Sequence, residues 1–349
     1  MTDASMYNEM RDAFAAAEAA HKDQLSEPRY ILGSHGVRMR IVGQDLAAQI
    51  HLPLAHLQHD AESSPPRLAI DLWDGKATGV SFPVDRDMDD GVWAWDTTWS
   101  DEGRFVTNIT PTSISCLDRS VPHIVGYARD SQLMSLHERG RPLQGPLTIW
   151  HNDRNVPLIH AGLVAQNGSG VLLGGPSGSG KSTSALACLL AGYGFVSDDK
   201  TGLQMLPDGS FVGHSLFAST MLETSAVRRF ADLAPHVLPN RYAFQRKHLV
   251  LLSRVFPRRL LRSVPIRALA LATVTDRRQT QLRPATKGEA LLALAPSSLM
   301  IGIESSGASG FHKLARLVDQ VDCYWLDLGS DTGSIPRCVE EILTKVGEP

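Results

Sequence analysis

The sequence predicts an α/β fold preceded by a smaller, strand-rich α+β part, and three observations predict it. Residues 170–174 form a short apolar strand that runs directly into a glycine-rich segment. Residues 182–191 are rich in helix formers with an apolar stripe, and Gly192 and Gly194 stop that helix. Ahead of this strand, loop and helix, short or alternating apolar runs are separated by Pro, Gly and Asp turns.

The elements of the strand-rich part follow from local patterns. Residues 8–24 are Ala-rich and predict a helix with Met10, Phe14 and Ala17 on one face. Apolar runs predict strands at residues 37–42, 68–73 and 92–95.

Further elements complete the α/β part. Residues 195–200 and 268–274 predict two more strands, and an apolar run occupies residues 249–252. A helix at 289–294, a strand at 323–328 and a helix at 335–346 finish the core.

Length and composition indicate a soluble enzyme of two domains. A chain of 349 residues suggests two domains, and the Gly and Pro content of residues 139–146 places the break there, giving domains 1–143 and 144–349. Hydrophobic content of 43% and a net charge of −3 are ordinary for a globular protein and imply no nucleic-acid partner. The four cysteines lack metal-ligand spacing and predict reduced thiols.

The N-terminal residues and the apolar runs of the sequence predict neither secretion nor a membrane span. The first residues carry an acidic residue rather than a basic segment before an apolar one. No apolar run approaches the roughly 18 residues that a spanning helix needs. A cytoplasmic location is therefore expected.

The segment Gly175-Pro-Ser-Gly-Ser-Gly-Lys-Ser182 matches G-x-x-x-x-G-K-[ST], a loop that wraps phosphates. Glycines permit a tight turn whose N–H groups converge on phosphate oxygens at the positive end of a helix. Lys181 reaches the β- and γ-phosphates, and the Ser182 hydroxyl joins the shell of a Mg²⁺. A glycine-rich turn without a ligand is the alternative, and the flanking strand and helix weigh against it. The predicted nucleotide-binding residues are Gly175, Pro176, Ser177, Gly178, Ser179, Gly180, Lys181, Ser182 and Thr183.

Two adjacent carboxylates, Asp198 and Asp199, stand at the end of the strand predicted at 195–200. Neighbouring side chains at a strand end point in different directions and can take different roles. One is suited to orient the metal shell, and the other to accept a proton from an attacking hydroxyl. A solvated Ser-Asp-Asp-Lys turn is the alternative.

His160, the phosphate loop and the Asp198-Asp199 pair together resemble the HPr kinase/phosphorylase family. The intervals from His160 to Lys181 and from Lys181 to Asp199 are similar to the family spacing without a gap. The resemblance implies a P-loop kinase domain of the HPr kinase and phosphoenolpyruvate carboxykinase type, which uses ATP and Mg²⁺ to phosphorylate a serine hydroxyl. It also implies Asp199 as proton acceptor, His160 in the active-site shell, and a homo-oligomer as one possible assembly.

The resemblance is tight only over residues 157–203. In the family a second metal carboxylate follows in a Leu-Glu-Ile-Arg-Gly-like segment, and this chain offers Leu222-Glu223-Thr224-Ser225 without the Arg-Gly. The resemblance thus implies Ser182, Asp198 and Glu223 as metal ligands, and leaves the reverse, phosphate-dependent reaction open. Residues 213–222 resemble HPr-kinase-related proteins encoded beside peptide-modification genes, some of which phosphorylate serine in a precursor peptide while others act on small molecules.

Cations after the Asp pair are candidates to reach the phosphoryl group. The stretch from Arg228 to Arg283 is Arg-rich, and Arg246 and Lys247 are chosen because they precede an apolar run. A solvated face is the alternative for any one of them.

The sequence therefore predicts a kinase acting on a serine in a peptide or protein. A small-molecule kinase acting on free serine or a similar alcohol is the first alternative. A nucleotide-binding regulatory module with little or no transfer is the second. The first domain shows no catalytic cluster, and elimination assigns it either to recognising the substrate or to covering the site.

Overall fold

The chain folds into two units in the computed structural model, which describes residues 3–59, 66–82, 96–100, 102–238, 247–299 and 307–347. The units are Met1–Trp150 and His151–Pro349. Their boundary lies between Trp150 and His151 rather than at the predicted 143/144.

The Gly and Pro residues at 139–146 end one helix and begin the next. Helix α4 (Leu136–Gly140) starts at a capping box in which Ser135 and Glu138 bond each other's backbone N–H. Helix α5 (Gln144–Asp153) follows after Leu143, whose φ is +55°. The end of α4 and the start of α5 both lie inside the first unit, so these Gly and Pro residues mark the ends of helices rather than the boundary between the units.

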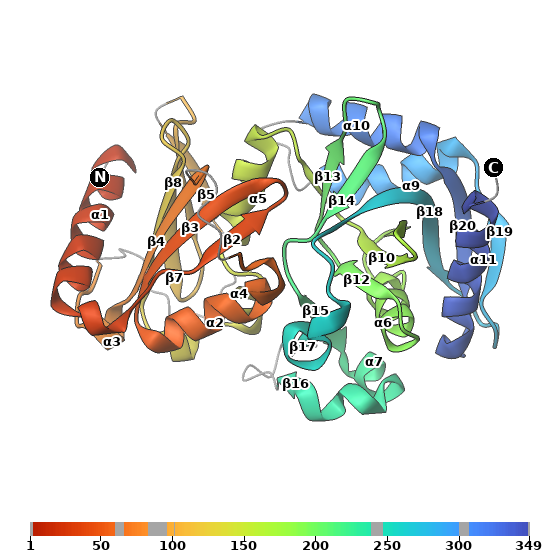
Figure 1. Ribbon diagram of the computed structural model, residues 1–349, viewed down its shortest axis with the longest axis horizontal. Coiled ribbons are helices and arrows are strands. Elements are labelled where there is room, and N and C mark those ends of the chain that lie inside the picture. The colour runs from red at the N-terminus through yellow and green to blue at the C-terminus, as the bar shows by residue number, and fades with distance from the viewer. Residues whose placement is uncertain are drawn as a thin grey trace. The chain divides into compact units, whose positions relative to one another are not determined.

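An eight-stranded sheet forms the first unit, in the order β1-β3-β4-β8-β7-β6-β5 with β2 paired to β3 (Figure 1). Its strands are β1 (Leu25–Ser26), β2 (Arg29–Leu32), β3 (His35–Val42), β4 (Leu68–Asp74), β5 (Asp96–Ser100), β6 (Phe105–Ile109), β7 (Ser113–Asp118) and β8 (His123–Ala128). Its other helices are α1 (Asp3–Ala20), α2 (Gln44–Leu54) and α3 (Gly75–Thr78), with short 3-10 turns at Lys22–Gln24, Ala55–Leu57 and Ser131–Leu133. The strand predicted at 92–95 lies outside the described residues.

The predicted helix at the start of the chain is α1. Met10, Phe14 and Ala17 are buried as one stripe, which packs against Trp73 and Val125 on one face of the sheet. The helical period of α1 and the alternation of side chains along the strands therefore explain why these apolar residues meet between the helix and the sheet.

Asp71 on β4 is the centre of a buried polar network between α1 and the sheet. Arg40 donates to both of its carboxylate oxygens, at 2.8 and 2.6 Å, and His123 Nε2 lies 3.0 Å from Oδ2. The other ring nitrogen of His123 lies 2.7 Å from the Tyr7 hydroxyl. Burial acts to raise the pKa of Asp71, but the hydrogen bonds from His123 and Arg40 outweigh it and the pKa is lowered.

We expect Asp71→Asn to destabilise the protein by about 2 kcal/mol, because it removes charged hydrogen bonds from a buried site. Thermal unfolding of the full chain measures the change. A lowered pKa means that the stabilisation is present above the ordinary value of 3.8 and is lost as pH falls through the folded-state value. The difference from wild type should therefore shrink in acid. The exposed control Asp319→Asn should leave stability unchanged, and an equal loss in both variants would contradict the network's role.

The second unit is built on a nine-stranded sheet in the order β12-β10-β11-β18-β14-β13-β9, with β20 paired to β18 and β19. Its strands are β9 (Leu158–Ile159), β10 (Gly162–Gln166), β11 (Ser169–Gly174), β12 (Gly194–Ser197), β13 (Thr201–Met205), β14 (Phe211–His214), β18 (Ser263–Val274), β19 (Gln281–Pro284) and β20 (Asp322–Leu328). A separate three-stranded sheet contains β15 (Ser219–Glu223), β17 (Lys247–Leu251) and β16 (Val237–Leu238).

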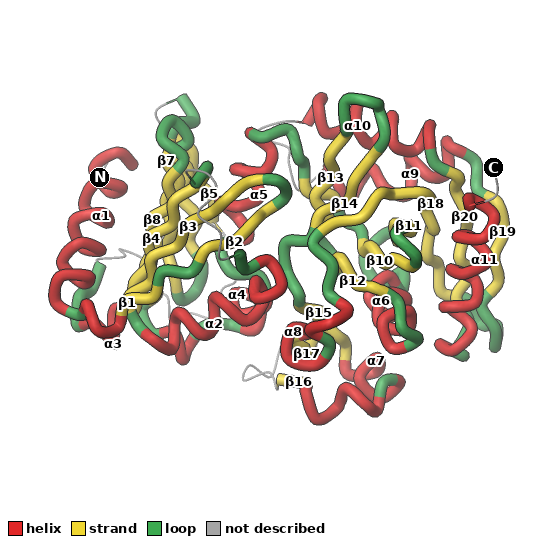
Figure 2. Tube along the Cα trace, in the orientation of Figure 1, coloured by secondary structure: helices red, strands yellow, loops and turns green. Residues whose placement is uncertain are grey.

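Helices cover both faces of the nine-stranded sheet, as Figures 1 and 2 show. The helices of this unit are α6 (Lys181–Leu190), α7 (Thr224–Arg229), α8 (Leu252–Val255), α9 (Lys287–Leu299), α10 (Gly307–Gln320) and α11 (Ile335–Gly347), with 3-10 turns at Ala231–His236, Pro257–Arg259 and Thr332–Ser334. α6 and α11 pack on one face, and α9 and α10 pack on the other. The mixed α/β class predicted from the sequence is confirmed.

The central strand β18 explains both layers. Its alternating residues Ala268, Ala270 and Ala272 face α6 and α11, while Leu269 and Leu271 face α9 and α10. Such a strand, apolar on both sides, is typical of a sheet that is covered on both faces.

The four cysteines are buried and form no disulfide bond among themselves. Within the described residues, no helix has the length and hydropathy needed to cross a membrane.

Candidate functional site

The glycine-rich loop lies between the end of β11 and the start of α6, and its shape depends on glycine. Gly175, Gly178 and Gly180 have φ values of +130°, +81° and +100°. A Cβ on Gly175 would lie 2.7 Å from Ser179 Oγ and 2.9 Å from the Ala272 carbonyl oxygen. A Cβ on Gly180 would overlap Leu328, whereas Gly178 has no atom within 4 Å of that position.

We therefore expect Gly180→Ala to destabilise the protein by about 2 kcal/mol or more, since it adds a steric overlap to backbone strain. Gly178→Ala is the matched control, because it adds backbone strain of roughly 1 kcal/mol in open space. Denaturant unfolding of the two variants compares them. An equal loss of unfolding free energy in the two variants would show that the close approach of Gly180 to Leu328 does not contribute to stability.

Lys181 is buried at the start of α6, with 6% of its surface exposed. Its Nζ donates to the carbonyl oxygens of Gly175 at 2.8 Å and Pro176 at 2.9 Å, so the ammonium group lies against the loop. Burial lowers the pKa of Lys181, and the nearby carboxylates of Asp199 and Asp198 oppose that shift. A phosphate oxygen is a stronger partner for this cation than a carbonyl.

A cleft of about 240 Å³ opens in front of the loop. Six of the nine predicted nucleotide-binding residues line it: Ser177, Gly178, Gly180, Lys181, Ser182 and Thr183. Gly175, Pro176 and Ser179 do not line it; they shape the loop from behind, through the Ser179 N–H to Pro176 carbonyl bond and the carbonyl groups that hold Lys181.

Asp199 and His160 lie in the same cleft, although 39 positions separate them in the chain. β12 ends just before the Asp pair, and β9 ends just before His160. His160 Nδ1 lies 3.0 Å from one carboxylate oxygen of Asp199, and Lys200 Nζ lies 3.6 Å from the other. The Asp199 carboxylate is thus held between two nitrogen groups at the edge of the phosphate loop.

Asp198 is not among the residues that line the cleft. It is 3% exposed, and Thr220 on β15 donates to its Oδ2 at 2.6 Å. Of the two neighbouring carboxylates, Asp199 lines the cleft and Asp198 does not, so the structure does not place Asp198 in the cleft lining, where the sequence predicts a catalytic or metal-binding role. The hydrogen bond from Thr220 instead connects Asp198, which directly follows β12, to β15.

The small sheet and α7 supply further residues of the cleft lining. Glu223 is the last residue of β15, and Lys247, which pairs with it in the strand register, is the first of β17. Both line the cleft, together with Ser225 and Arg229 of α7. Arg246 lies outside the described residues. Sequence patterns had not singled out Arg229 or Lys200, because each is one charged residue among many.

The donor set of the cleft fits a metal carried in with a nucleotide. Among the described residues, no three His, Cys, Asp or Glu side chains form a metal-binding group. Mg²⁺ is usually held by one or two protein oxygens, by water and by substrate phosphates. Ser182, Asp199 and Glu223 place such oxygens along the phosphate loop, whereas Asp198 of the predicted ligand set lies outside the cleft.

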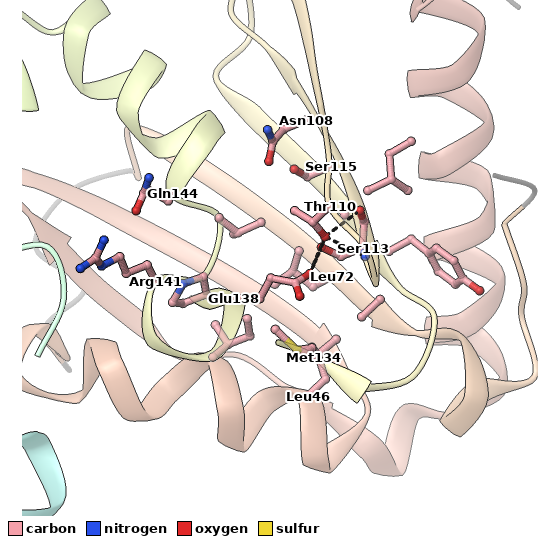
Figure 3. A pocket seen from close by; sticks show the side chains of 17 residues that line it. Leu46, Leu72, Asn108, Thr110, Ser113, Ser115, Met134, Glu138, Arg141 and Gln144 are labelled. Atoms are coloured by element: carbon pink, nitrogen blue, oxygen red, sulfur yellow. Dashed lines mark hydrogen bonds between the residues drawn. The ribbon is translucent and has the colours of Figure 1, made fainter. Parts of the chain in front are cut away.

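A second cavity lies within the first unit, between the sheet and the residues of α2 and α4 (Figure 3). Its volume of about 40 Å³ is room for a water or two. The buried Glu138 carboxylate there accepts hydrogen bonds from Thr110, from Thr112 at 2.8 Å and from Ser113 at 3.1 Å. Glu138 also caps α4, so this carboxylate has a structural role.

Neither a family model nor a curated protein matches the chain. Among solved structures, the chain is similar to the HPr(Ser) kinase/phosphatase from Coxiella burnetii, at 11% identity and a TM-score of 0.28. That match covers 54% of this chain and 94% of the other.

Proposed function

We propose that the second unit is a kinase that uses ATP and Mg²⁺ to phosphorylate a serine hydroxyl of a peptide or protein. The observation that supports it most is one cleft that holds the loop cation Lys181, the Ser182 hydroxyl and the Asp199 carboxylate. A phosphate-binding group and a proton acceptor in one space are the two parts that phosphoryl transfer to an alcohol needs.

Phosphate binding is assigned to the loop and to Lys181. The loop N–H groups and the N-terminus of α6 favour negative charge. Lys181 would exchange its two carbonyl partners for oxygens of the β- and γ-phosphates. Lys247 and Arg229 add positive charge to the cleft lining, where they would stabilise charge on the transferring group.

Mg²⁺ would be held by the Ser182 hydroxyl and by the Glu223 carboxylate, which comes from the end of β15. When bound, the ion neutralises charge on the phosphate oxygens and orients them.

Asp199 is assigned as the proton acceptor. The acceptor oxygen forms a bond to the γ-phosphorus while the bond from that phosphorus to the β,γ-bridging oxygen breaks. The hydroxyl proton passes to Asp199, and ADP leaves with the electron pair. His160 and Lys200 position the carboxylate through the contacts at 3.0 and 3.6 Å.

The test uses mass spectrometry of candidate acceptors incubated with the full chain, ATP and Mg²⁺. The panel contains an HPr-like protein, serine-containing peptides and free serine. A gain of roughly 80 Da on a peptide or protein, absent with Lys181→Ala, supports the proposal. A gain on free serine alone would favour a small-molecule kinase. Nucleotide binding without transfer to any acceptor would favour a regulatory module.

A further inference from the structure

The order of strands gives the cleft two chemically different ends. β12 and β20 both run parallel to β11, β12 by way of the antiparallel β10 and β20 by way of the parallel β18. The carboxyl ends of these four parallel strands therefore lie along one edge of the sheet, where α/β proteins bind ligands. The phosphate loop, which follows β11, has Asp199 on the β12 side and Val274 with Leu328 on the β18 and β20 side.

The end beyond β18 is apolar. Val274, the last residue of β18, is 63% exposed, although it lines a cleft that is otherwise mostly polar. Leu328 and Ile335 also line this end of the cleft, and both are buried. The remaining lining residue here is Gly329, whose N–H already donates to Thr280 Oγ1 at 3.2 Å. The lining side chains of this end thus have no hydrogen-bonding group.

The apolar end adjoins the phosphate loop directly. A Cβ on Gly180 would overlap Leu328 and would lie 3.7 Å from Val274 Cγ2. A group connected to a phosphate in the loop therefore needs little length to reach Val274.

We propose that Val274, with Leu328, Gly329 and Ile335, forms a subsite for the purine ring of the nucleotide and holds it by apolar contact. This subsite rests on the proposed function, which places the γ-phosphoryl beside Asp199. The nucleoside then extends to the other side of the loop, toward Val274. An apolar surface there is covered by the flat face of a base and gains the free energy of burial.

The subsite predicts low selectivity between purines. A site that reads a base by hydrogen bonds rejects the wrong one by several orders of magnitude, because its buried polar groups would be left unpaired. Val274, Leu328 and Ile335 have no such groups to leave unpaired. We expect ATP and GTP to bind within about threefold of each other.

The test measures binding to the full chain by calorimetry, with Mg²⁺ present and with ATP, GTP and inorganic tripolyphosphate as the three probes. Val274→Asn should weaken ATP and GTP binding about tenfold, because it replaces apolar surface with a polar group of similar size. Tripolyphosphate, which has no base, should bind both proteins equally. Val274→Ile keeps the apolar surface and should bind ATP as wild type does.

The outcomes separate this subsite from the kinase proposal. If ATP binds but Val274→Asn leaves it unchanged, or weakens tripolyphosphate equally, the subsite is overturned and the kinase stands. Discrimination between ATP and GTP beyond a hundredfold would overturn the apolar mode of recognition. If wild-type protein binds neither ATP nor tripolyphosphate, both proposals are overturned.

Discussion

Replacement of Lys181 by alanine is expected to reduce phosphoryl transfer about a thousandfold and to weaken nucleotide binding. The variant removes the buried cation that lies on the loop carbonyls of Gly175 and Pro176, and with it the charge that would neutralise the phosphates. Initial rates of transfer to the acceptor found by mass spectrometry, together with calorimetry of ATP, measure both effects.

The affinity of the wild type for ATP is also expected to depend on pH. Because burial lowers the pKa of Lys181, its ammonium group loses its proton at a lower pH than that of an ordinary lysine. ATP binding by the wild type should therefore weaken as pH rises through that pKa.

Lys345→Ala is the matched control for this variant. Lys345 is an exposed lysine on α11 that pairs with Glu341 at 2.7 Å, and its removal should leave both transfer and binding unchanged. A Lys181→Ala protein that retains wild-type transfer would contradict the assignment of the loop as the phosphate site.

Asp199→Asn is expected to lower transfer about a thousandfold and to leave ATP binding within a few fold of wild type. The amide keeps the size of the carboxylate and loses its ability to accept the hydroxyl proton. Single-turnover rates at saturating ATP isolate the transfer step from binding. Full transfer in this variant would remove Asp199 as the proton acceptor.

The adjacent Asp198→Asn variant is the sharpest control that the chain offers. Its side chain accepts a hydrogen bond from Thr220 and does not line the cleft, and the amide oxygen of asparagine can still accept that hydrogen bond. We expect transfer to stay within about tenfold of wild type, with a loss of stability of about 1 kcal/mol. A larger loss of transfer from Asp198→Asn than from Asp199→Asn would reverse the two roles.

Local patterns in the sequence predict the strand, loop and helix around the phosphate loop to within a residue or two. The expected strand at 170–174 is β11, and the expected helix at 182–191 is α6. These elements are set by short-range apolar periodicity and glycine stops, which a single sequence displays. The predicted HPr kinase type of the domain stays a prediction.

Long-range contacts explain what the sequence left open. Alternation at a strand end predicts that the side chains of Asp198 and Asp199 diverge. Local patterns do not predict the hydrogen bond that Thr220, a residue of another strand, donates to Asp198. Arg229 reaches the cleft because α7 follows β15, whose pairing with β17 joins segments far apart in the chain. The expected break at 139–146 was placed by its Gly and Pro residues, which instead end α4 and begin α5.

The fate of the γ-phosphoryl group in a single turnover tests whether the second unit is a kinase. Protein in excess over γ-labelled ATP is mixed with Mg²⁺ and the acceptor panel, and the label is traced in acceptor, inorganic phosphate and unreacted ATP. The kinase predicts label on one acceptor hydroxyl with an equal amount of ADP formed, and retention of the label in ATP when Lys181→Ala or Asp199→Asn replaces the wild type. Label that stays in ATP or appears only as inorganic phosphate with every acceptor, while ATP is bound at the loop, would contradict it.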